Sequence, residues 1–237
     1  LMLKQFDSFG RGISSGSKLP SVATLLSDIN RIWDASLKSK DLVVLETSPT
    51  YIKEKGMNFL VRLLKSDGLK KKGSNIKSPQ AAIADPFDYA TLNRNLLVHT
   101  FENHVLLLNK FPVMKNHCVL VTKSFKSQCS PLTQDDFEAI TSILSQIPSL
   151  VFYNCGVDSG ASQSHKHIQL IPYDSFENEK TPFDEFMEGK PVPSNAMCQC
   201  PLYLFDHVLY PISSSSDPHE LYQHYSEMVE HMTKVRQ

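Results

Sequence analysis

Four short apolar runs in the middle of the chain constrain its fold more than any other feature. They are HVLLLNKF and HCVLVTK, joined by PVMKN, and then SLVFYN and HKHIQLIPY. Runs of this length, rich in Val, Leu and Ile and bounded by turn residues, are typical of buried strands. Because the connection between the first two is too short for a crossover, we expect an antiparallel pair in the middle of a sheet.

Helical patterns lie on both sides of these runs. Over residues 19–38 apolar side chains recur at spacings of three and four, which is the helical period. Thr133 is a candidate N-cap, and Asp136 stands at the capping-box position of a second helix. A closing helix is expected over about residues 218–235. Helices of this kind must cover a sheet, so the sequence predicts an α+β fold, an antiparallel sheet with packed helices.

Other segments are less regular. Further strands are expected over residues 41–46, 57–64 and 201–212. The stretch 65–80 is basic and poor in apolar residues, which predicts a surface loop. Its three lysines at positions 70–72 are either a solvated charge run or contacts to a phosphate group.

Composition limits the classes of partner. Lys and Arg (24) nearly balance Asp and Glu (25), so no overall field favours nucleic acid or a membrane surface, and an anionic ligand must be met by local groups. No apolar run approaches the ~20 residues of a membrane span, and the first residues lack the apolar core of a signal peptide. Five cysteines without a CxxC pair are typical of reduced thiols. We therefore expect an intracellular protein.

The stretch CGVDSGASQSHKHIQL sets two histidines one residue apart, after a Gly/Ser run and just before a glutamine. On a strand, alternate side chains share a face, so His165, His167 and Gln169 would point the same way. Three polar groups on a central strand are costly unless they face a ligand. The preceding glycines and serines permit close backbone approach and supply donors to an anion. We therefore predict a phosphate-binding loop that faces two imidazoles.

Metal binding is an alternative use of this motif, since His-x-His pairs also ligate metals. Position 169 carries an amide, which is a poor zinc ligand, so we expect no metal bound by the triad positions. A structural metal site that combines His165 and His167 with Cys198 and Cys200 remains open.

The same residues carry a resemblance to a known superfamily. Five positions resemble the histidine-triad pattern, in which an Asn ends one strand and a Gly/Ser loop leads into His-x-His: Asn154, Gly160, Ser162, His165 and His167. Gln169 in the third position resembles the transferase branch, which includes galactose-1-phosphate uridylyltransferase, rather than the hydrolase branch. VFYNCGVDSGASQSHKHIQ and LLLNKFPVMKNHCVLVTKSFKSQ are similar to the fungal-type diadenosine tetraphosphate phosphorylases (ATP adenylyltransferases).

The resemblance implies a histidine-triad-like, galactose-1-phosphate-uridylyltransferase-like fold. It implies a single nucleotidyltransferase domain over residues 1–237 with its core at about 85–173. Residues 174–237 are then a partial second half, cut short relative to family members. The implied reaction is phosphorolysis of diadenosine 5',5'''-tetraphosphate to ADP and ATP. A hydrolase of dinucleoside polyphosphates or nucleoside phosphoramidates and a non-catalytic nucleotide-binding module are the alternatives.

The implied mechanism is covalent. By resemblance, His167 attacks the α-phosphorus, expels ATP and leaves an adenylylated histidine, from which inorganic phosphate takes the adenylyl group. A backbone carbonyl is expected to hold His167 in the right tautomer. His165 is expected to orient the phosphate or support the nucleophile. Gln169 is expected to donate its amide to a phosphoryl oxygen.

The resemblance also implies substrate contacts elsewhere. Phosphate binding is expected from five residues around the Gly/Ser loop: Asn154, Gly160, Ala161, Ser162 and Gln163. Asn109 and Lys110 are expected to contact the ribose or a phosphate, and Lys72, with Lys71 beside it, the phosphate chain. Three further histidines are expected in structural or surface positions: His99, His104 and His117.

Ligands and partners follow from the same resemblance. The partners are an adenine dinucleoside polyphosphate, ATP, ADP and inorganic phosphate, and the charge of that substrate calls for a divalent cation, Mg²⁺. No nucleic acid or membrane partner is expected. The chain is expected to act as a monomer or weak homodimer, in the cytoplasm and also in the nucleus.

Overall fold

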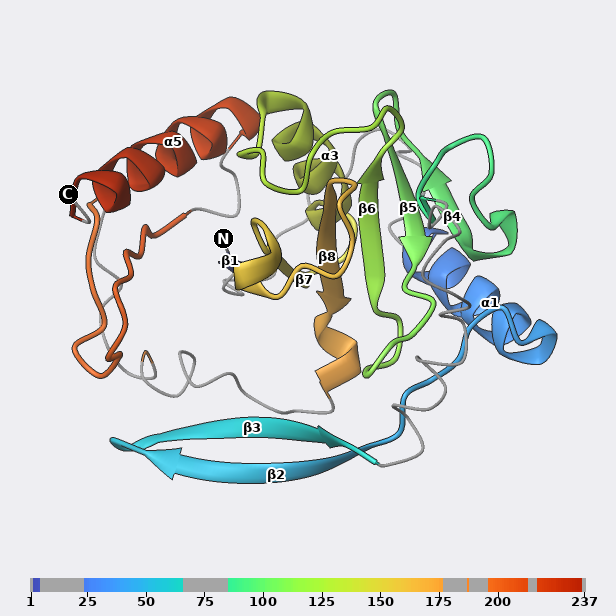
Figure 1. The fold of residues 1–237 in the computed structure, drawn as a ribbon, viewed down its shortest axis with the longest axis horizontal. Helices are drawn as coiled ribbons and strands as arrows, with labels where there is room; N and C mark the ends of the chain where they lie inside the picture. The colour runs from blue at the N-terminus through green and yellow to red at the C-terminus, as the bar shows by residue number, and fades with distance from the viewer. Residues whose placement is uncertain are drawn as a thin grey trace, which may run out of the picture.

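A six-stranded antiparallel sheet forms the centre of the molecule (Figure 1). The computed structural model describes residues 2–4, 24–65, 85–176, 187, 196–212 and 217–235. The strands of the sheet are β1 (Met2–Lys4), β4 (Leu97–Thr100), β5 (His104–Leu108), β6 (Cys118–Thr122), β7 (Ser149–Phe152) and β8 (His167–Pro172). Their spatial order is β1-β7-β8-β6-β5-β4, so β8 and β6 lie in the middle of the sheet.

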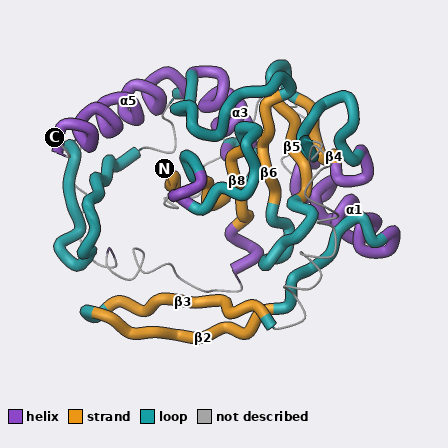
Figure 2. Tube along the Cα trace, viewed as in Figure 1, coloured by secondary structure: helices purple, strands orange, loops and turns teal. Residues whose placement is uncertain are grey.

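Among the described residues, three helices lie beside this sheet, as Figure 2 shows. The helices are α1 (Thr24–Ser39), α3 (Gln134–Leu144) and α5 (Pro218–Val235), with short 3-10 turns η1 (Arg94–Leu96), η2 (Val157–Ser159) and η3 (Tyr173–Phe176). α1 contacts β4 and β5, and α5 packs on α3. None of the helices in the described ranges is long and apolar enough to cross a membrane.

The two faces of the sheet carry different side chains because neighbours along a strand alternate. On the helix-covered face, Leu120 lies opposite Ile168, and both pack with Phe137 of α3 in the larger core cluster. On the other face, Val119 lies opposite Gln169 and Val121 opposite His167. The valines belong to a smaller cluster covered by aromatic and leucine side chains from residues 87–97. The polar side chains of β8 therefore project from the face that the helices leave uncovered.

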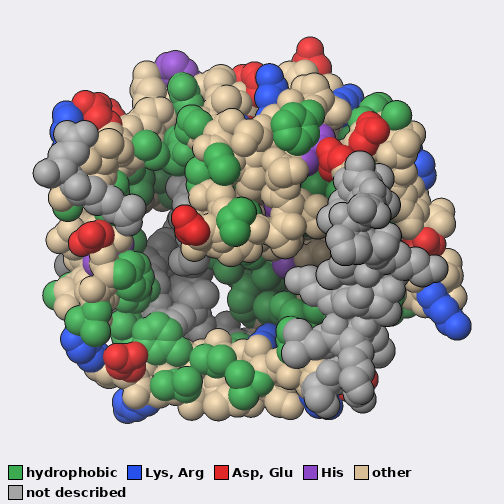
Figure 3. Space-filling model, viewed as in Figure 1, with side chains coloured by type: hydrophobic (Ala, Val, Ile, Leu, Met, Phe, Trp, Pro, Cys, Tyr) green, Lys and Arg blue, Asp and Glu red, His purple; other side chains and the backbone are tan. Residues whose placement is uncertain are grey.

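A separate two-stranded hairpin lies along the lower edge of the view, apart from the main sheet (Figure 1). It consists of β2 (Thr47–Glu54) and β3 (Met57–Leu64), with Lys55 and Gly56 at the turn. Both turn residues have positive φ, 48° and 83°, as a tight hairpin turn requires. The space-filling view shows a hollow between this hairpin and the sheet, with hydrophobic side chains gathered along it (Figure 3).

Several sequence predictions are confirmed. The α+β class, the antiparallel pair β5–β6 in the sheet, and the strands β3, β7 and β8 agree with the structure. The helix after Thr133 begins with the expected capping box. The helix expected from residue 19 is observed from Thr24, and residues 19–23 lie outside the described ranges.

Other predictions are wrong. Residues 41–46 form no strand, because Val43 and Leu45 each donate one backbone bond, to the carbonyls of Lys110 and Pro112, without a continuous ladder. Residues 201–212 form no strand either, and their one ladder contact is the isolated bridge between Cys198 and Leu209. β2 and β4 were not expected. The proposed domain division stays a prediction.

The core should respond strongly to truncation at Phe137. This side chain is fully buried between the sheet and α5, so Phe137→Ala should lower the free energy of unfolding by about 3–5 kcal/mol. Leu37→Ala in α1 is the control, since Leu37 is 40% exposed and should change stability by less than about 1 kcal/mol. Urea unfolding measures both. Equal losses in the two variants would contradict this assignment of the core.

Candidate active site

His167 begins β8 and has one ring nitrogen engaged and one available. Its Nδ1 lies 2.9 Å from the backbone carbonyl of His165, so Nδ1 carries the proton and donates. This is the backbone carbonyl that the sequence prediction placed behind His167, and the prediction is confirmed. Within the described ranges, Nε2 has no hydrogen-bond partner. The ring of Phe87 packs against the His167 ring, and the two ring centroids are 5.2 Å apart. The lone pair of Nε2 is therefore free to act as a nucleophile.

The surroundings of His167 keep its imidazole neutral. Its side chain is buried, and burial lowers the pKa of His167 below the ordinary value. The bond to the His165 carbonyl opposes this shift, while the neighbouring His165 ring lowers the pKa further. A neutral ring with the proton fixed on Nδ1 presents a basic nitrogen on the opposite side.

His165 is engaged at both ring nitrogens. Nδ1 lies 2.6 Å from the carboxylate of Asp85, and Nε2 lies 2.8 Å from the backbone carbonyl of Thr122. The Thr122 hydroxyl also lies 3.0 Å from Nε2, so both ring nitrogens have partners within the protein and neither is available for attack. Phe125 packs edge-on against the ring. Of the two histidines in the motif, only His167 can serve as the nucleophile in this arrangement.

A glutamine outside the motif holds the backbone around the nucleophile. The Gln128 Oε1 accepts a bond from the His167 N–H at 2.7 Å, and its Nε2 donates to the Asn154 carbonyl at 2.7 Å. The hydroxyl of Tyr153 donates to the Gln128 carbonyl at 2.7 Å. Gln128 therefore joins the end of the segment before the Gly/Ser loop to the start of β8.

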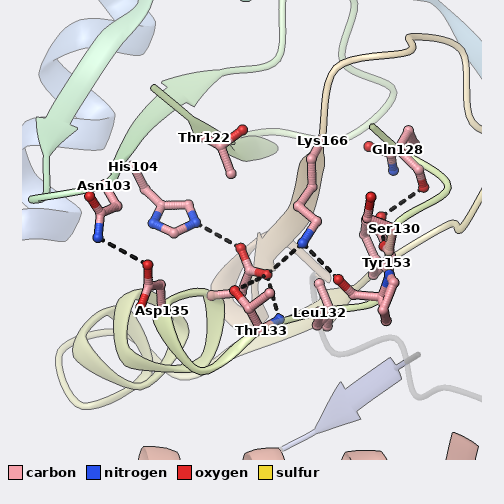
Figure 4. A network of polar contacts seen from close by, with 12 residues as sticks. Asn103, His104, Thr122, Gln128, Ser130, Leu132, Thr133, Asp135, Tyr153 and Lys166 are labelled. Carbon is pink, nitrogen blue, oxygen red and sulfur yellow. Dashed lines mark hydrogen bonds and ion pairs between the residues drawn. The ribbon is translucent and has the colours of Figure 1, made fainter. Parts of the chain in front are cut away.

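Lys166, between the two histidines, points to the opposite side of the sheet and is almost completely buried. Figure 4 shows it reaching toward the start of α3, where Thr133 lies. Lys166 Nζ donates to Asp136 Oδ2 and to the carbonyl of Pro131, both at 2.8 Å. Asp136 also accepts from His104 Nε2 at 2.8 Å and from the Thr133 N–H at 2.7 Å. The middle residue of His-x-His is thus anchored to a helix N-terminus by a buried ion pair.

Gln169 lies on the same face as His167 and contacts His117, the residue just before β6. His117 Nε2 is 3.0 Å from Gln169 Oε1, and His117 Nδ1 is 3.4 Å from Asn109 Nδ2. The expected common face of the motif is confirmed for His167 and Gln169 by the strand register. His165 precedes the strand and forms an isolated bridge with Ser127, yet its ring also packs on Phe87.

The Gly/Ser loop folds back on itself before it reaches the histidines. Gly160 adopts a left-handed conformation with φ of 87°, and its N–H donates to the Val157 carbonyl at 2.8 Å. The Ala161 N–H donates to the Gly156 carbonyl at 3.2 Å. These two N–H groups are therefore engaged within the loop. The N–H groups of Ser162 and Gln163 have no hydrogen-bond partner among the described residues, and they remain candidates for anion binding.

Asn154 and Gly160 lie side by side. A Cβ added to Gly160 would sit 3.9 Å from Asn154 Nδ2, so the asparagine amide is directed along the loop. That nitrogen has no hydrogen-bond partner within the part of the chain that the structure describes. The side-chain amide of Asn154 is thus a further available donor beside the loop.

Two predicted substrate contacts are not joined to this site. Lys110 is exposed, with Nζ 5.6 Å from the centroid of the Phe111 ring, and no contact among the described residues connects it to His167. Lys72 and its neighbour Lys71 lie outside the described residues. Their predicted roles stay predictions.

The cysteine and histidine residues near position 200 do not assemble a metal site. His207 Nε2 accepts the Cys200 backbone N–H at 2.8 Å, and its Nδ1 donates to the Phe205 carbonyl at 2.8 Å. Across the described ranges, no three or more His, Cys, Asp or Glu side chains are grouped as metal ligands.

Four residues of this site were not predicted from the sequence as parts of it: Asp85, Thr122, Gln128 and His117. His117 had been expected in a structural or surface position. Asp85 and Gln128 lie 80 and 39 residues before the histidines they contact. No local pattern marks such pairs, so only the tertiary structure reveals them.

The chain is similar to known proteins over most of its length. Residues 16–189 match the family model described as Ap4A phosphorylase N-terminal domain. The chain is 33% identical over 173 residues to diadenosine 5',5'''-P1,P4-tetraphosphate phosphorylase 2 of Saccharomyces cerevisiae, covering 65% of this chain and 50% of that protein. It is 27% identical to Protein APA1 of the same yeast over 159 residues, 63% of this chain and 49% of that protein. The chain thus spans about half the length of the curated relatives it matches.

Solved structures agree with the fold. The crystal structure of yeast Ap4A phosphorylase Apa2 superimposes with a TM-score of 0.72 and 27% identity, over 90% of this chain and 72% of that one. The same protein in complex with Ap4A gives a TM-score of 0.70 and 28% identity, over 88% of this chain and 73% of that one. The fold class expected from the sequence is confirmed.

The buried anchor of Lys166 should give the protein a specific acid sensitivity. Burial alone would raise the pKa of Asp136, but hydrogen bonds from His104 and Lys166 lower it to about 2 from 3.8. A carboxyl group whose pKa is lower in the folded protein than in the unfolded chain stabilises the fold at pH values above the unfolded-state pKa. That stabilisation is lost as pH falls through the folded-state pKa. We expect Asp136→Asn to cost about 3 kcal/mol at pH 7, because it leaves Lys166 buried without its ion pair.

The deficit of Asp136→Asn relative to wild type should shrink by about 2 kcal/mol as pH falls from about 4 to about 2. Asp135→Asn is the matched control, since Asp135 is exposed and bonded only to Asn103 among the described residues. Urea unfolding across this pH range measures the differences. A deficit independent of pH, or an equal one in the control, would refute the role of this carboxylate.

Proposed function

The chain belongs to the Ap4A phosphorylase N-terminal domain family, and on that premise we propose that it catalyses phosphorolysis of diadenosine tetraphosphate to ADP and ATP through an adenylylated His167. The observation that carries the proposal is the difference between the two motif histidines. Both nitrogens of His165 have hydrogen-bond partners in the protein, whereas His167 donates at Nδ1 and its Nε2 has no partner among the described residues. A covalent nucleotidyl transfer requires one such nitrogen.

The first step forms a bond between His167 Nε2 and the α-phosphorus and breaks the bond from that phosphorus to the bridging oxygen of the leaving ATP. The ring becomes positively charged as Nε2 gives its lone pair, and the Nδ1–H bond to the His165 carbonyl strengthens with that charge. In the second step an oxygen of inorganic phosphate attacks the same phosphorus. The N–P bond breaks, ADP leaves, and His167 returns to its neutral form.

Hydrogen-bond donors around Nε2 stabilise the negative charge that develops on the phosphoryl oxygens. The candidates are the Gln169 amide, the Asn154 amide and the backbone N–H groups of Ser162 and Gln163. Each donor aimed at developing charge typically contributes about 3 kcal/mol to lowering the barrier. The Gly160 and Ala161 N–H groups bond within the loop and support its shape instead.

The lack of a third histidine favours transfer to phosphate over transfer to water. Gln169 offers a neutral donor at the position where a third imidazole could supply or accept a proton. An amide cannot act as a general base for water, so the adenylylated histidine persists until phosphate arrives.

Mg²⁺ fits this site only through the substrate. The described residues hold no cluster of carboxylates that would supply its oxygen ligands, whereas polyphosphate oxygens and water are ligands that Mg²⁺ prefers. We propose that the cation accompanies the dinucleotide. We further propose that the chain acts as a monomer or weak homodimer. Because all five cysteines are free thiols, we place it in a reducing compartment such as the cytoplasm.

The reaction is tested by product analysis with adenosine-labelled diadenosine tetraphosphate, with and without inorganic phosphate. Wild-type protein should form ADP and ATP only when phosphate is present, and His167→Ala should lower this rate by at least about 1,000-fold because the nucleophile is lost. His231→Ala is the matched control, since His231 is exposed on α5. Formation of AMP and ATP without phosphate would instead identify a hydrolase, and nucleotide binding without turnover would identify a non-catalytic module.

The pH dependence of the first step follows from the shift at His167. Because burial lowers the pKa of His167, Nε2 stays unprotonated at pH values below the ordinary histidine pKa of 6.5. The rate of histidine adenylylation should therefore stay constant from neutral pH to below 6.5 and then fall as acid protonates the ring. Rapid mixing across pH 4.5 to 8, followed by an alkaline quench that preserves the acid-labile N–P bond, would measure this. A rate that halves at or above the ordinary pKa would contradict the assignment.

A further inference from the structure

Three polar side chains form a hydrogen-bonded series that ends at Gln169. Val119 of β6 lies opposite Gln169, so His117, two positions before Val119, projects on the same face of the sheet. Its Nε2 is 3.0 Å from Gln169 Oε1, and its Nδ1 is 3.4 Å from Asn109 Nδ2. The Asn109 N–H also donates to the His117 carbonyl at 2.8 Å, which closes the connection between β5 and β6. The three side chains thus lie in a fixed order.

The donor and the acceptor of each hydrogen bond in this series are fixed. Asn109 Oδ1 accepts the Phe111 N–H at 3.0 Å, so the amide nitrogen of Asn109 is the group that faces His117. An amide nitrogen only donates, so His117 Nδ1 accepts and the ring proton lies on Nε2. That proton is donated to Gln169 Oε1. The oxygen of the Gln169 amide is therefore turned toward His117, and its NH₂ group is turned away.

The buried surroundings of His117 keep this direction constant. Burial is the main cause that lowers the pKa of His117 to about 4, and the nearby His167 ring acts in the same direction. The hydrogen bond to Gln169 acts in the opposite direction and raises it. At neutral pH the ring therefore holds one proton. A single proton and a single lone pair, each with its own partner, leave one arrangement that satisfies all three side chains.

We propose that His117, supported by Asn109, is a positioning residue that locks the Gln169 amide with its NH₂ group toward the phosphoryl group on His167. Without it, a glutamine amide can turn by 180° and present Oε1, whose partial negative charge repels a phosphoryl oxygen. Gln169 lies two residues from His167 on the same strand face, so the two side chains are neighbours on that face. The inference rests on the proposed function and adds a residue to its machinery.

Kinetics of His167 adenylylation test the role of His117. The full chain is mixed with diadenosine tetraphosphate and quenched, and the adduct is counted at each time. His117→Phe keeps an aromatic ring and removes the donor, so the rate should fall about 100-fold with little change in KM. His117→Gln can still donate to Gln169 Oε1 and should recover most of the rate. His99→Phe, at an exposed position of β4, is the matched control.

A double-variant comparison separates positioning from a general structural effect. Because His117 acts through Gln169, His117→Phe should change the rate less than about twofold in a Gln169→Ala background. Full multiplication of the two losses would overturn the proposal. So would an undiminished rate in His117→Phe protein.

Nitrogen-15 NMR of histidine-labelled wild-type protein reads the tautomer without any turnover. At pH 7 the His117 ring should be neutral with its proton on Nε2, and a proton on Nδ1 or on both nitrogens would overturn the proposal. This measurement also stands if His117→Phe fails to fold. A wild-type chain that forms no adenylyl-histidine would refute the proposed function, whereas the wrong tautomer alone would refute only the positioning role.

Discussion

The buried ion pair between Lys166 and Asp136 fixes the segment on which the site depends. Lys166 is 2% exposed and Asp136 1% exposed. Removing either charge would therefore lower the free energy of unfolding by about 3 kcal/mol or more, because the other would stay buried and unpaired. Asp136 is also the N3 residue of the capping box at the start of α3. The register of the segment is therefore tied to a helix on one side of the sheet. Because side chains alternate, His165 and His167 are held on the other side.

This constraint explains how two histidines one residue apart acquire different chemistry. The carbonyl of His165 is turned toward the ring of His167 and takes its Nδ1 proton. The ring of His165 is meanwhile held by Asp85 and Thr122. In the proposed mechanism one imidazole thus serves as scaffold and the other as nucleophile. Gln128, which bonds to the His167 N–H and the Asn154 carbonyl, connects this pair to the Gly/Ser loop.

Local patterns predicted the parts of the site that lie within one strand and its neighbours. The alternation of His167 and Gln169, the capping-box residue Asp136 and the antiparallel pair β5–β6 all follow from short-range sequence patterns. The partners Asp85 and Gln128 were missed because their contacts span 80 and 39 residues. The sequence carries no local signal for contacts that only the packing of distant segments creates.

Errors in the fold have a similar cause. Residues 41–46 have the composition of a strand, but Val43 and Leu45 use their N–H groups on the carbonyls of Lys110 and Pro112 rather than on a neighbouring strand. Leu42 and Leu45 are nevertheless buried. An apolar run therefore predicts burial more securely than it predicts a ladder partner, since the partner depends on which backbone lies nearby.

The central claim is that one nitrogen of one histidine carries the adenylyl group. The most direct measurement incubates the chain with diadenosine tetraphosphate in the absence of inorganic phosphate, digests the protein at alkaline pH, and identifies the nucleotidyl peptide by mass spectrometry and phosphorus-31 NMR. The account predicts a single adenylyl group linked to Nε2 of His167. An adduct on His165, a link through Nδ1, or formation of ADP and ATP on later addition of phosphate by a protein that carried no covalent adduct would contradict it.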